Sequence, residues 1–180
     1  MGNFTFIETH IKDLIVVEPK VYGDERGFNM ETYHKKSFYE GGIEIEFVQD
    51  NFSRSIKGVL RGMHFQITEP QGKLVRVVEG EVFDVAVDIR KDSETYGSWY
   101  GINLSEDNKR MLYLPEGFAH GFYVLSDTAQ FSYKLTRFYN QKDEGGFRYD
   151  DKTIAIEWPL EGNVPIVSEK DLALKEFIEI

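Results

Sequence analysis

The 180-residue sequence predicts an all-β fold, an antiparallel β-sandwich or barrel, on two observations. From Lys73 onward, short stretches rich in β-branched and aromatic residues recur between glycine-containing turns. These stretches show little of the 3.6-residue periodicity that marks helices. Many short, regularly spaced strands are typical of sandwiches and barrels. A chain of this length can bury one core and is short for two, so we expect a single domain over residues 1–180.

The N-terminal third predicts strands interrupted by one short helix. Expected here are a strand at 14–18 closed by Pro19, an extended stretch at 30–33, a helix at 35–40 ended by Gly41-Gly42, and a strand at 47–53 that runs into a loop. Within the last strand, Gln49 and Asn51 are two positions apart, so their side chains face the same side.

The remaining elements follow from alternation and turns. Residues 74–79 and 81–88 are two alternating runs joined by a turn at Gly80, and Phe83, Val85 and Val87 form an apolar face. Further strands are expected at 99–104, 111–114, 122–125 and 130–138. A short helix is expected at 168–176, with Ser168 as its N-cap.

Composition restricts the classes of function. The net charge of −10 argues against nucleic-acid binding, which needs clustered Lys and Arg. An anionic small ligand is compatible with this charge if a few basic residues line its pocket. There is no cysteine, and no apolar run is long enough to cross a bilayer. We therefore expect a soluble, cytoplasmic protein that binds neither membranes nor nucleic acid.

Two segments, residues 58–66 and 115–122, each place a histidine in an apolar, glycine-punctuated run. Their side chains, His64 and His120, are able to project into one cavity. A single histidine beside apolar residues is more often structural than catalytic, but Arg61 and Lys73 lie close by in sequence. Arg61 and His64 have opposite strand parity, so a shared site requires a β-bulge, for which Gly62 is a candidate.

The same segments resemble the two cupin motifs, in which His-x-His on one strand and a histidine after Pro-x-Gly on another hold a metal. Gln66 stands at the second histidine position, and the ammonium group of Lys73 follows nearby. Because this set is poor in metal ligands, we predict a pocket without metal. In such a pocket an imidazole can remove a proton beside a carbonyl, and a lysine can stabilise the enolate. Tyr133 is a candidate acid, although packing of its ring is the more common use of a tyrosine in a strand.

Nearly the whole chain resembles the dTDP-4-dehydrorhamnose 3,5-epimerase family. The resemblance is carried, in order, by residues 22–31, 49–66, 73–90, 115–122, 133–139, 144–151 and 156–171. It implies a homodimeric jelly roll of the cupin class, without cofactor, that inverts C3 and C5 of the 4-keto sugar of dTDP-4-keto-6-deoxy-D-glucose, towards dTDP-L-rhamnose.

The resemblance also implies roles for individual residues. His64 matches the general base, Asp171 its orienting partner, Tyr133 the general acid and Lys73 the group that faces the enolate oxygen. Tyr139 matches an aromatic ring that stacks on thymine. Other positions match ligand contacts: Arg26, Glu31, Gln49, Asn51, Arg61, His120, Glu144 and Lys170. Because the N-terminal segment in this family reaches the neighbouring subunit, Arg26 and Glu31 are expected to serve the partner's site.

The sequence is also compatible with three other functions. A related enzyme of another dTDP-deoxysugar pathway would epimerise one carbon, C3 or C5, or move the keto group as a ketoisomerase. A metal-dependent cupin oxygenase is disfavoured by Gln66. A non-catalytic nucleotide-sugar binding module would bind dTDP without exchanging substrate protons.

Overall fold

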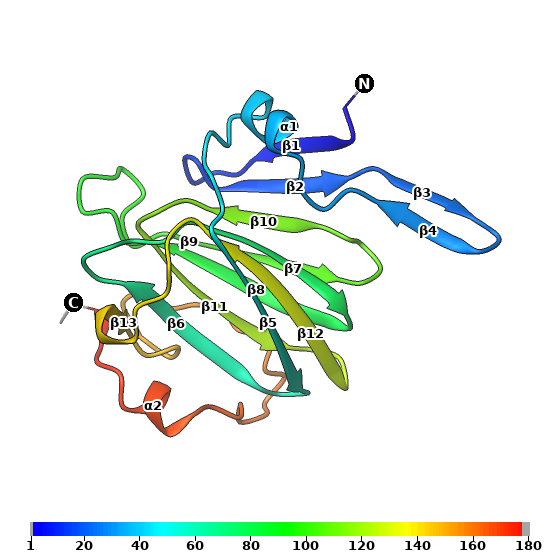
Figure 1. Ribbon diagram of the computed structural model, residues 1–180. Coiled ribbons are helices and arrows are strands. Elements are labelled where there is room, and N and C mark those ends of the chain that lie inside the picture. The colour runs from blue at the N-terminus through cyan, green and yellow to red at the C-terminus, as the bar shows by residue number, and fades with distance from the viewer. Residues whose placement is uncertain (1, 178–180) are drawn as a thin grey trace.

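The computed structural model describes residues 2–177, whose strands form two antiparallel sheets facing each other (Figure 1). The six-stranded sheet has the order β1 (Phe4–Glu8), β2 (Ile15–Pro19), β10 (Met111–Leu114), β7 (Lys73–Glu79), β12 (Thr128–Leu135), β5 (Gln49–Ile56). The five-stranded sheet has the order β13 (Glu144–Gly146), β6 (Leu60–Gln66), β11 (Phe118–Val124), β8 (Glu81–Asp88), β9 (Trp99–Ser105). The predicted all-β sandwich is confirmed.

The remaining elements are short. A two-stranded hairpin, β3 (Val21–Asp24) and β4 (Gly27–Met30), extends away from the body of the sandwich (Figure 1). The helices of the described residues are α1 (Lys35–Glu40), the 3-10 turn η1 (Gln141–Asp143) and α2 (Glu169–Leu172). None of these helices is long and apolar enough to cross a membrane. The peripheral helices, one near the C-terminus, therefore agree with the prediction.

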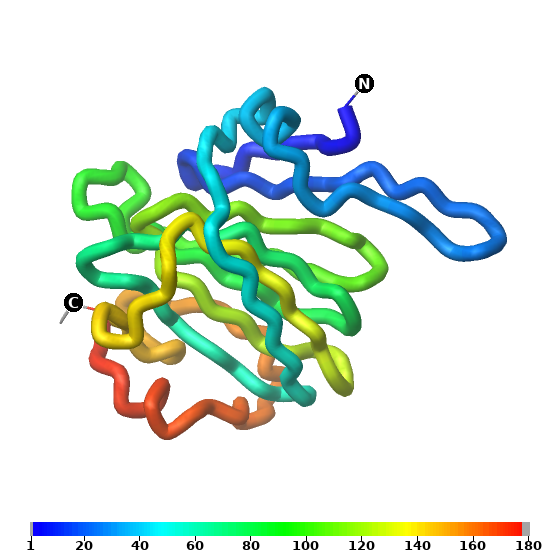
Figure 2. The backbone as a smooth tube through the Cα atoms, in the orientation of Figure 1, coloured from blue at the N-terminus to red at the C-terminus, as the bar shows by residue number. Residues whose placement is uncertain are grey.

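Apolar side chains fill the space between the two sheets and also cover their outer faces. The central core joins Val75 and Phe131 of the six-stranded sheet to Val82 and Phe122 of the five-stranded sheet. On the outer face of the five-stranded sheet lies the C-terminal segment, whose course is visible in Figure 2. The predicted apolar face of Phe83, Val85 and Val87 packs there. Because both faces of β8 are covered, a polar side chain on either face of this strand is shielded from solvent.

The structure corrects several predicted elements. Gly80 does not close a hairpin, because β7 and β8 belong to different sheets and the chain crosses between sheets there. Gly80 has a φ of 80°, and a Cβ at this position would lie 2.1 Å from the carbonyl oxygen of Thr128. The strand predicted at 47–53 is β5, but it begins at Gln49 and continues to Ile56 where a loop was expected, because its residues pair continuously with β12. The extended stretch predicted at 30–33 stops at Met30, where pairing with β3 ends.

Other boundaries differ by a few residues. Strand β11 begins at Phe118 rather than residue 122, because its first residues pair with β8. Strand β12 ends at Leu135 rather than 138, and α2 has only four residues. Ser168 is its N-cap, as predicted, since its side chain accepts a hydrogen bond from the Asp171 N–H. Strands β1, β3 and β13 were not predicted.

Candidate active site

Strands β6 and β11 bring the two predicted histidines together, because His64 and His120 are paired residues in this antiparallel ladder. Two residues further along β11, Phe122 is paired with Arg61, so β6 has one extra residue in this interval. Gly62 occupies the interval with a φ of 125°, and a Cβ there would lie 2.6 Å from Cα of Gly121. This is the predicted bulge. It turns Arg61 to the same side as His64, and both line one cavity.

The candidate active site is a cavity of two adjoining lobes between the sheets, about 260 and 180 Å³ in volume. His64, Lys73 and Tyr133 line both lobes. The larger lobe adds other residues predicted for the site, Asn51, Tyr139 and Glu144, and the smaller lobe adds Arg61 and His120. Side chains separated by up to 93 positions in the sequence are therefore brought to one place.

His64 is held by a buried carboxylate. Its Nε2 lies 2.8 Å from Oδ1 of Asp171, and the Gly62 N–H donates to Oδ2 at 3.3 Å. Burial would raise the pKa of Asp171, but the hydrogen bonds from His64 and from the Gly62 N–H hold it below its usual value. An ionised carboxylate only accepts, so neutral His64 carries its proton on Nε2 and its lone pair on Nδ1. Nδ1 is then the atom available as a base.

Lys73 is a cation that lines both lobes of the cavity. Its Nζ lies 3.5 Å from the carbonyl oxygen of His64. Burial lowers the pKa of Lys73 to about 8, although the carboxylates of Asp84 and Glu144 act to raise it. The ammonium form therefore still predominates at pH 7, close enough to its pKa for pH to change its charge.

Asp84, which was not predicted from the sequence, lies behind the cavity against His120. It is fully buried, and its Oδ2 lies 2.9 Å from Nε2 of His120. Burial lowers the pKa of His120 more than Asp84 raises it, so the imidazole is neutral and donates to Asp84. Within the described residues, Oδ1 of Asp84 has no hydrogen-bond partner. The sequence does indicate its position. Asp84 lies between the apolar residues Val82 and Ala86, on the face of β8 opposite the apolar face that was predicted.

Tyr133 has a defined hydrogen-bonding role in the cavity. Its hydroxyl oxygen accepts a hydrogen bond from the side-chain amide of Asn51 at 3.0 Å. Asn51 in turn accepts from Gln49 at 2.8 Å, so the predicted orientation of both amides towards one side is confirmed. Because the amide nitrogen only donates, the phenolic proton of Tyr133 remains available to another group.

Tyr139, Glu144 and Lys170 form a cluster of hydrogen-bonded side chains at the edge of the larger lobe. The Tyr139 hydroxyl donates to Oε2 of Glu144 at 2.5 Å, and Nζ of Lys170 lies 2.6 Å from the same oxygen. Burial would raise the pKa of Glu144, but the hydrogen bonds from Lys170 and Tyr139 hold it lower than usual. The hydrogen bond to Glu144, with burial, raises the pKa of Tyr139 to about 12. Tyr139 lines the larger lobe and is 47% exposed, so part of its side chain is accessible to a ligand.

Two predicted residues lie away from the cavity. Arg26 is at the tip of the β3–β4 hairpin, where it pairs with Asp24 at 2.5 Å, and its side chain is 85% exposed. Glu31 follows directly after β4, and neither residue lines either lobe.

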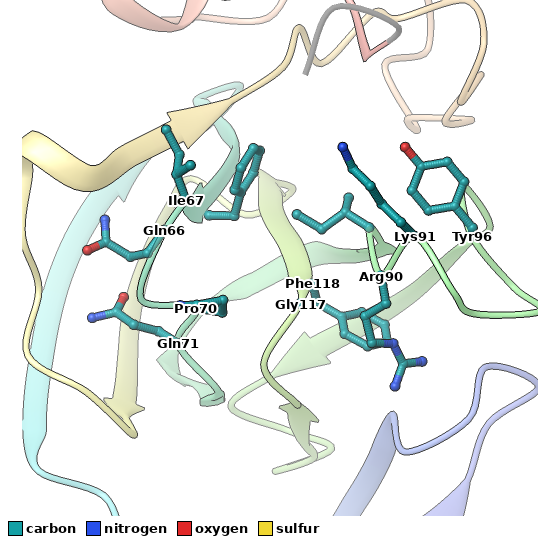
Figure 3. A pocket seen from close by; sticks show the side chains of 11 residues that line it. Gln66, Ile67, Pro70, Gln71, Arg90, Lys91, Tyr96, Gly117 and Phe118 are labelled. Carbon is teal, nitrogen blue, oxygen red and sulfur yellow. The ribbon is translucent and has the colours of Figure 1, made fainter.

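The position of the second cupin histidine is taken by a structural amide. Oε1 of Gln66 accepts a hydrogen bond from the Asn140 N–H at 2.9 Å. Within residues 2–177, no three His, Asp or Glu side chains form a metal-binding group. Gln66 and Gln71 also border a separate, mostly apolar cavity of about 360 Å³, where Lys91 and Tyr96 lie opposite them (Figure 3).

Comparisons with known proteins point to one family. The model of the dTDP-4-dehydrorhamnose 3,5-epimerase family matches residues 8–179. The dTDP-4-dehydrorhamnose 3,5-epimerase of Shigella flexneri is 57% identical over 176 residues, 96% of each chain. That of Methanothermobacter thermautotrophicus is 54% identical, over 95% of this chain and 93% of the relative. The crystal structure of the dTDP-6-deoxy-D-glucose-3,5-epimerase of Legionella pneumophila, in complex with dTDP-4-keto-L-rhamnose, aligns with a TM-score of 0.93 at 54% identity, covering 96% of this chain and 92% of that one.

Proposed function

Because the chain belongs to the dTDP-4-dehydrorhamnose 3,5-epimerase family, a family of sugar-nucleotide isomerases, we propose that it inverts C3 and C5 of dTDP-4-keto-6-deoxy-D-glucose, towards dTDP-L-rhamnose. One observation carries the proposal beyond family membership. His64, Lys73 and Tyr133 line a single cavity, and His64 is held there by the buried Asp171. These are a base, a cation and an acid, the three groups that inversion beside a carbonyl requires.

In the first half of the reaction, Nδ1 of His64 removes the proton from the carbon beside the C4 carbonyl. The electron pair of the broken C–H bond forms a C=C bond, and the C=O electron pair moves to the oxygen, which gives an enolate. The Lys73 ammonium stabilises the negative oxygen. Asp171 stabilises the imidazolium that forms on His64.

In the second half, Tyr133 donates its proton to the opposite face of the same carbon. The Tyr133 O–H bond breaks, a new C–H bond forms and the C=O bond is restored, so the carbon is inverted. His64 then releases a proton to solvent and the Tyr133 phenolate regains one. The same steps at the second carbon complete the reaction without a cofactor.

Binding of the nucleotide uses the groups around the reacting residues. Arg61 in the smaller lobe suits a diphosphate, and the partly exposed ring of Tyr139 suits stacking on thymine. Gln49, Asn51, His120, Glu144 and Lys170 contact other parts of the ligand.

The protein acts as a homodimer in this proposal, with Arg26 and Glu31 contributing to the partner's site. Support comes from the projecting β3–β4 hairpin (Figure 1), whose Tyr22 and Phe28 are 49% and 59% exposed. Large exposed apolar side chains on an isolated hairpin favour burial against another chain.

Proton NMR of dTDP-4-keto-6-deoxy-D-glucose in deuterated water tests the reaction. Deuterium is expected at both C3 and C5, and His64→Asn is expected to abolish its uptake. Uptake at one carbon would instead assign a single-carbon epimerase or ketoisomerase. Binding of dTDP without uptake by the folded wild-type protein would contradict any epimerase function and assign a binding module.

A further inference from the structure

We propose that Gln49 and Asn51 are positioning residues for Tyr133, forming a one-way chain of hydrogen bonds from the Tyr139 backbone to the Tyr133 hydroxyl. The inference rests on the proposed function, in which Tyr133 is the acid. It assigns the two amides a role in proton donation, in addition to contact with ligand.

Three hydrogen bonds in series make up the chain. The Tyr139 N–H donates to Oε1 of Gln49 at 2.9 Å. Nε2 of Gln49 donates to Oδ1 of Asn51 at 2.8 Å. Nδ2 of Asn51 donates to the hydroxyl oxygen of Tyr133 at 3.0 Å.

The direction of the chain is fixed at its first bond. A backbone N–H can only donate, so the oxygen of the Gln49 amide must face Tyr139 and its nitrogen must face Asn51. The same argument turns the oxygen of Asn51 to Gln49 and its nitrogen to Tyr133. Tyr133 is therefore an acceptor from Asn51, and its own proton is directed to a different acceptor. The orientation of both amides suits Tyr133 as a proton donor.

The chain is built on paired strands and ends on a loop. Asn51 and Tyr133 are opposite each other in the β5–β12 ladder, and Gln49 lies on the same face of β5. The loop at 137–140 has no backbone acceptor, within the described residues, for the N–H groups of Tyr139 and Asn140. Gln49 and Gln66 accept from these N–H groups. A shift of the Tyr139 backbone would consequently break the first bond of the chain.

This arrangement matters most after proton transfer. Once Tyr133 has lost its proton, the phenolate accepts a charge-assisted hydrogen bond from Asn51, which is stronger than the bond to the neutral hydroxyl. The Gln49–Asn51 bond polarises the Asn51 amide and strengthens it further. Loss of the chain should therefore slow proton donation by Tyr133 more than proton removal by His64.

Two rates separate these steps. Deuterium uptake without inversion requires only the base, whereas inversion also requires the acid. Both are measured by NMR in deuterated water for the wild type, Asn51→Asp, Gln49→Glu and, as a reference for loss of the acid, Tyr133→Phe. Asn51→Asp places an acceptor against the Tyr133 hydroxyl and Gln49→Glu removes the donor to Asn51. Asp50→Asn, at an exposed position between them on the same strand, is the matched control.

We expect the ratio of the inversion rate to the deuterium-uptake rate to fall by at least about tenfold in Asn51→Asp and by a smaller factor in Gln49→Glu. In Asp50→Asn this ratio should equal that of the wild type. An equal fall in both rates, or a change in KM alone, would overturn the inference and leave the amides as ligand contacts. Circular dichroism and dTDP affinity establish that each variant is folded and binds. Failure of the proposed function would be distinguishable, because the wild type itself would then exchange neither carbon, which would overturn the inference as well.

Discussion

Nε2 of His64 and Oδ1 of Asp171 lie 2.8 Å apart, although 107 positions separate them in the sequence. The contact depends on α2, whose N-cap Ser168 fixes the backbone of Asp171 beside strand β6. The carboxylate also accepts from the Gly62 N–H, so the bulge that turns Arg61 into the cavity also positions Asp171. One local distortion of β6 therefore sets the geometry of the base, of its partner and of a cation.

Replacing Asp171 by Asn should leave the fold intact and lower kcat by roughly two orders of magnitude or more, because an uncharged amide does not stabilise the imidazolium. In addition, the single amide oxygen can accept from the Gly62 N–H or from His64 but not from both, so the Nε2–H tautomer of His64 is held less firmly. Steady-state kinetics with dTDP-4-keto-6-deoxy-D-glucose would measure the loss. Glu169→Gln is the matched control, since Glu169 is exposed on the same helix. Activity of Asp171→Asn within a few-fold of the wild type would show that His64 does not need this carboxylate.

The decrease of kcat at alkaline pH should reflect deprotonation of Lys73. Because burial lowers the Lys73 pKa to about 8, the ammonium that stabilises the enolate is lost as pH rises through that value. Asp84 opposes this shift, so Asp84→Asn should move the decrease of kcat to a pH below 8 while the amide oxygen still accepts from His120. The measurement is kcat from pH 6 to pH 10 for both proteins. If kcat of the wild type and of Asp84→Asn decreased at the same pH, the carboxylate of Asp84 would not stabilise the ammonium form of Lys73.

Much of the site was predictable because its residues lie at strand positions whose parity the sequence reveals. Gln49 and Asn51 share a face, and the clash between the parities of Arg61 and His64 required a bulge at Gly62. The contact of His64 with Asp171 rested only on family resemblance, since no local pattern relates a strand to a helix so distant in sequence. Asp84 was missed because the alternation of β8 was interpreted for one face only, whereas both faces of this strand are covered.

The errors in the fold have a related cause. Gly80 has the positive φ of a tight turn, and sequence alone does not distinguish a hairpin from a crossing between sheets. Short strands such as β13 owe their existence to pairing with β6, not to their own glycine-rich sequence.

Tyr139 should contribute to nucleotide affinity through its ring. Tyr139→Ala is expected to raise the Kd for dTDP by roughly 5- to 100-fold, the range for loss of stacking on a base. Tyr139→Phe keeps the ring and loses only the hydrogen bond to Glu144, so its effect should be smaller. Isothermal titration with dTDP measures both, with Phe138→Ala as the control at the adjacent, 72% exposed position. Equal affinity of the wild type and Tyr139→Ala would exclude stacking.

Asp88 should stabilise the fold at neutral pH and lose this effect in acid. It is fully buried, and although burial alone would raise its pKa, hydrogen bonds from Arg90, Ser93 and Thr95 lower it to about 2. A folded-state pKa below the unfolded value means stabilisation that is complete above about pH 4 and disappears towards pH 2, worth about 2 kcal/mol.

Asp88→Asn should therefore lower the free energy of unfolding in urea by about 2 kcal/mol or more at pH 7, and by progressively less below pH 4. The exposed Asp92→Asn serves as the control. If the free energies of unfolding of the wild type and Asp88→Asn differed by the same amount at pH 3 and pH 7, the stabilisation would not depend on ionisation of Asp88.

Arg26 provides a test of the proposed dimer, because its side chain is 85% exposed on a hairpin that projects from the chain carrying it. If Arg26 serves the partner's site, each site of the dimer combines His64 of one chain with Arg26 of the other chain. Arg26→Ala and His64→Asn then remove groups that the two different chains contribute to one site. In a mixed dimer, the His64 of one chain and the Arg26 of the other then complete one site. Equal mixing gives half mixed dimers with one complete site each, so about a quarter of the wild-type activity should return.

Each variant is expected to be inactive or weakly active when assayed alone. The two variants are mixed, unfolded and refolded together, and the mixture is assayed at low substrate concentration. His64→Asn mixed with Tyr133→Phe is the control: both residues line the cavity of one chain, so no mixed dimer has a complete site and no activity should return. If the Arg26→Ala mixture also stays inactive while forming mixed dimers, Arg26 does not act across the interface.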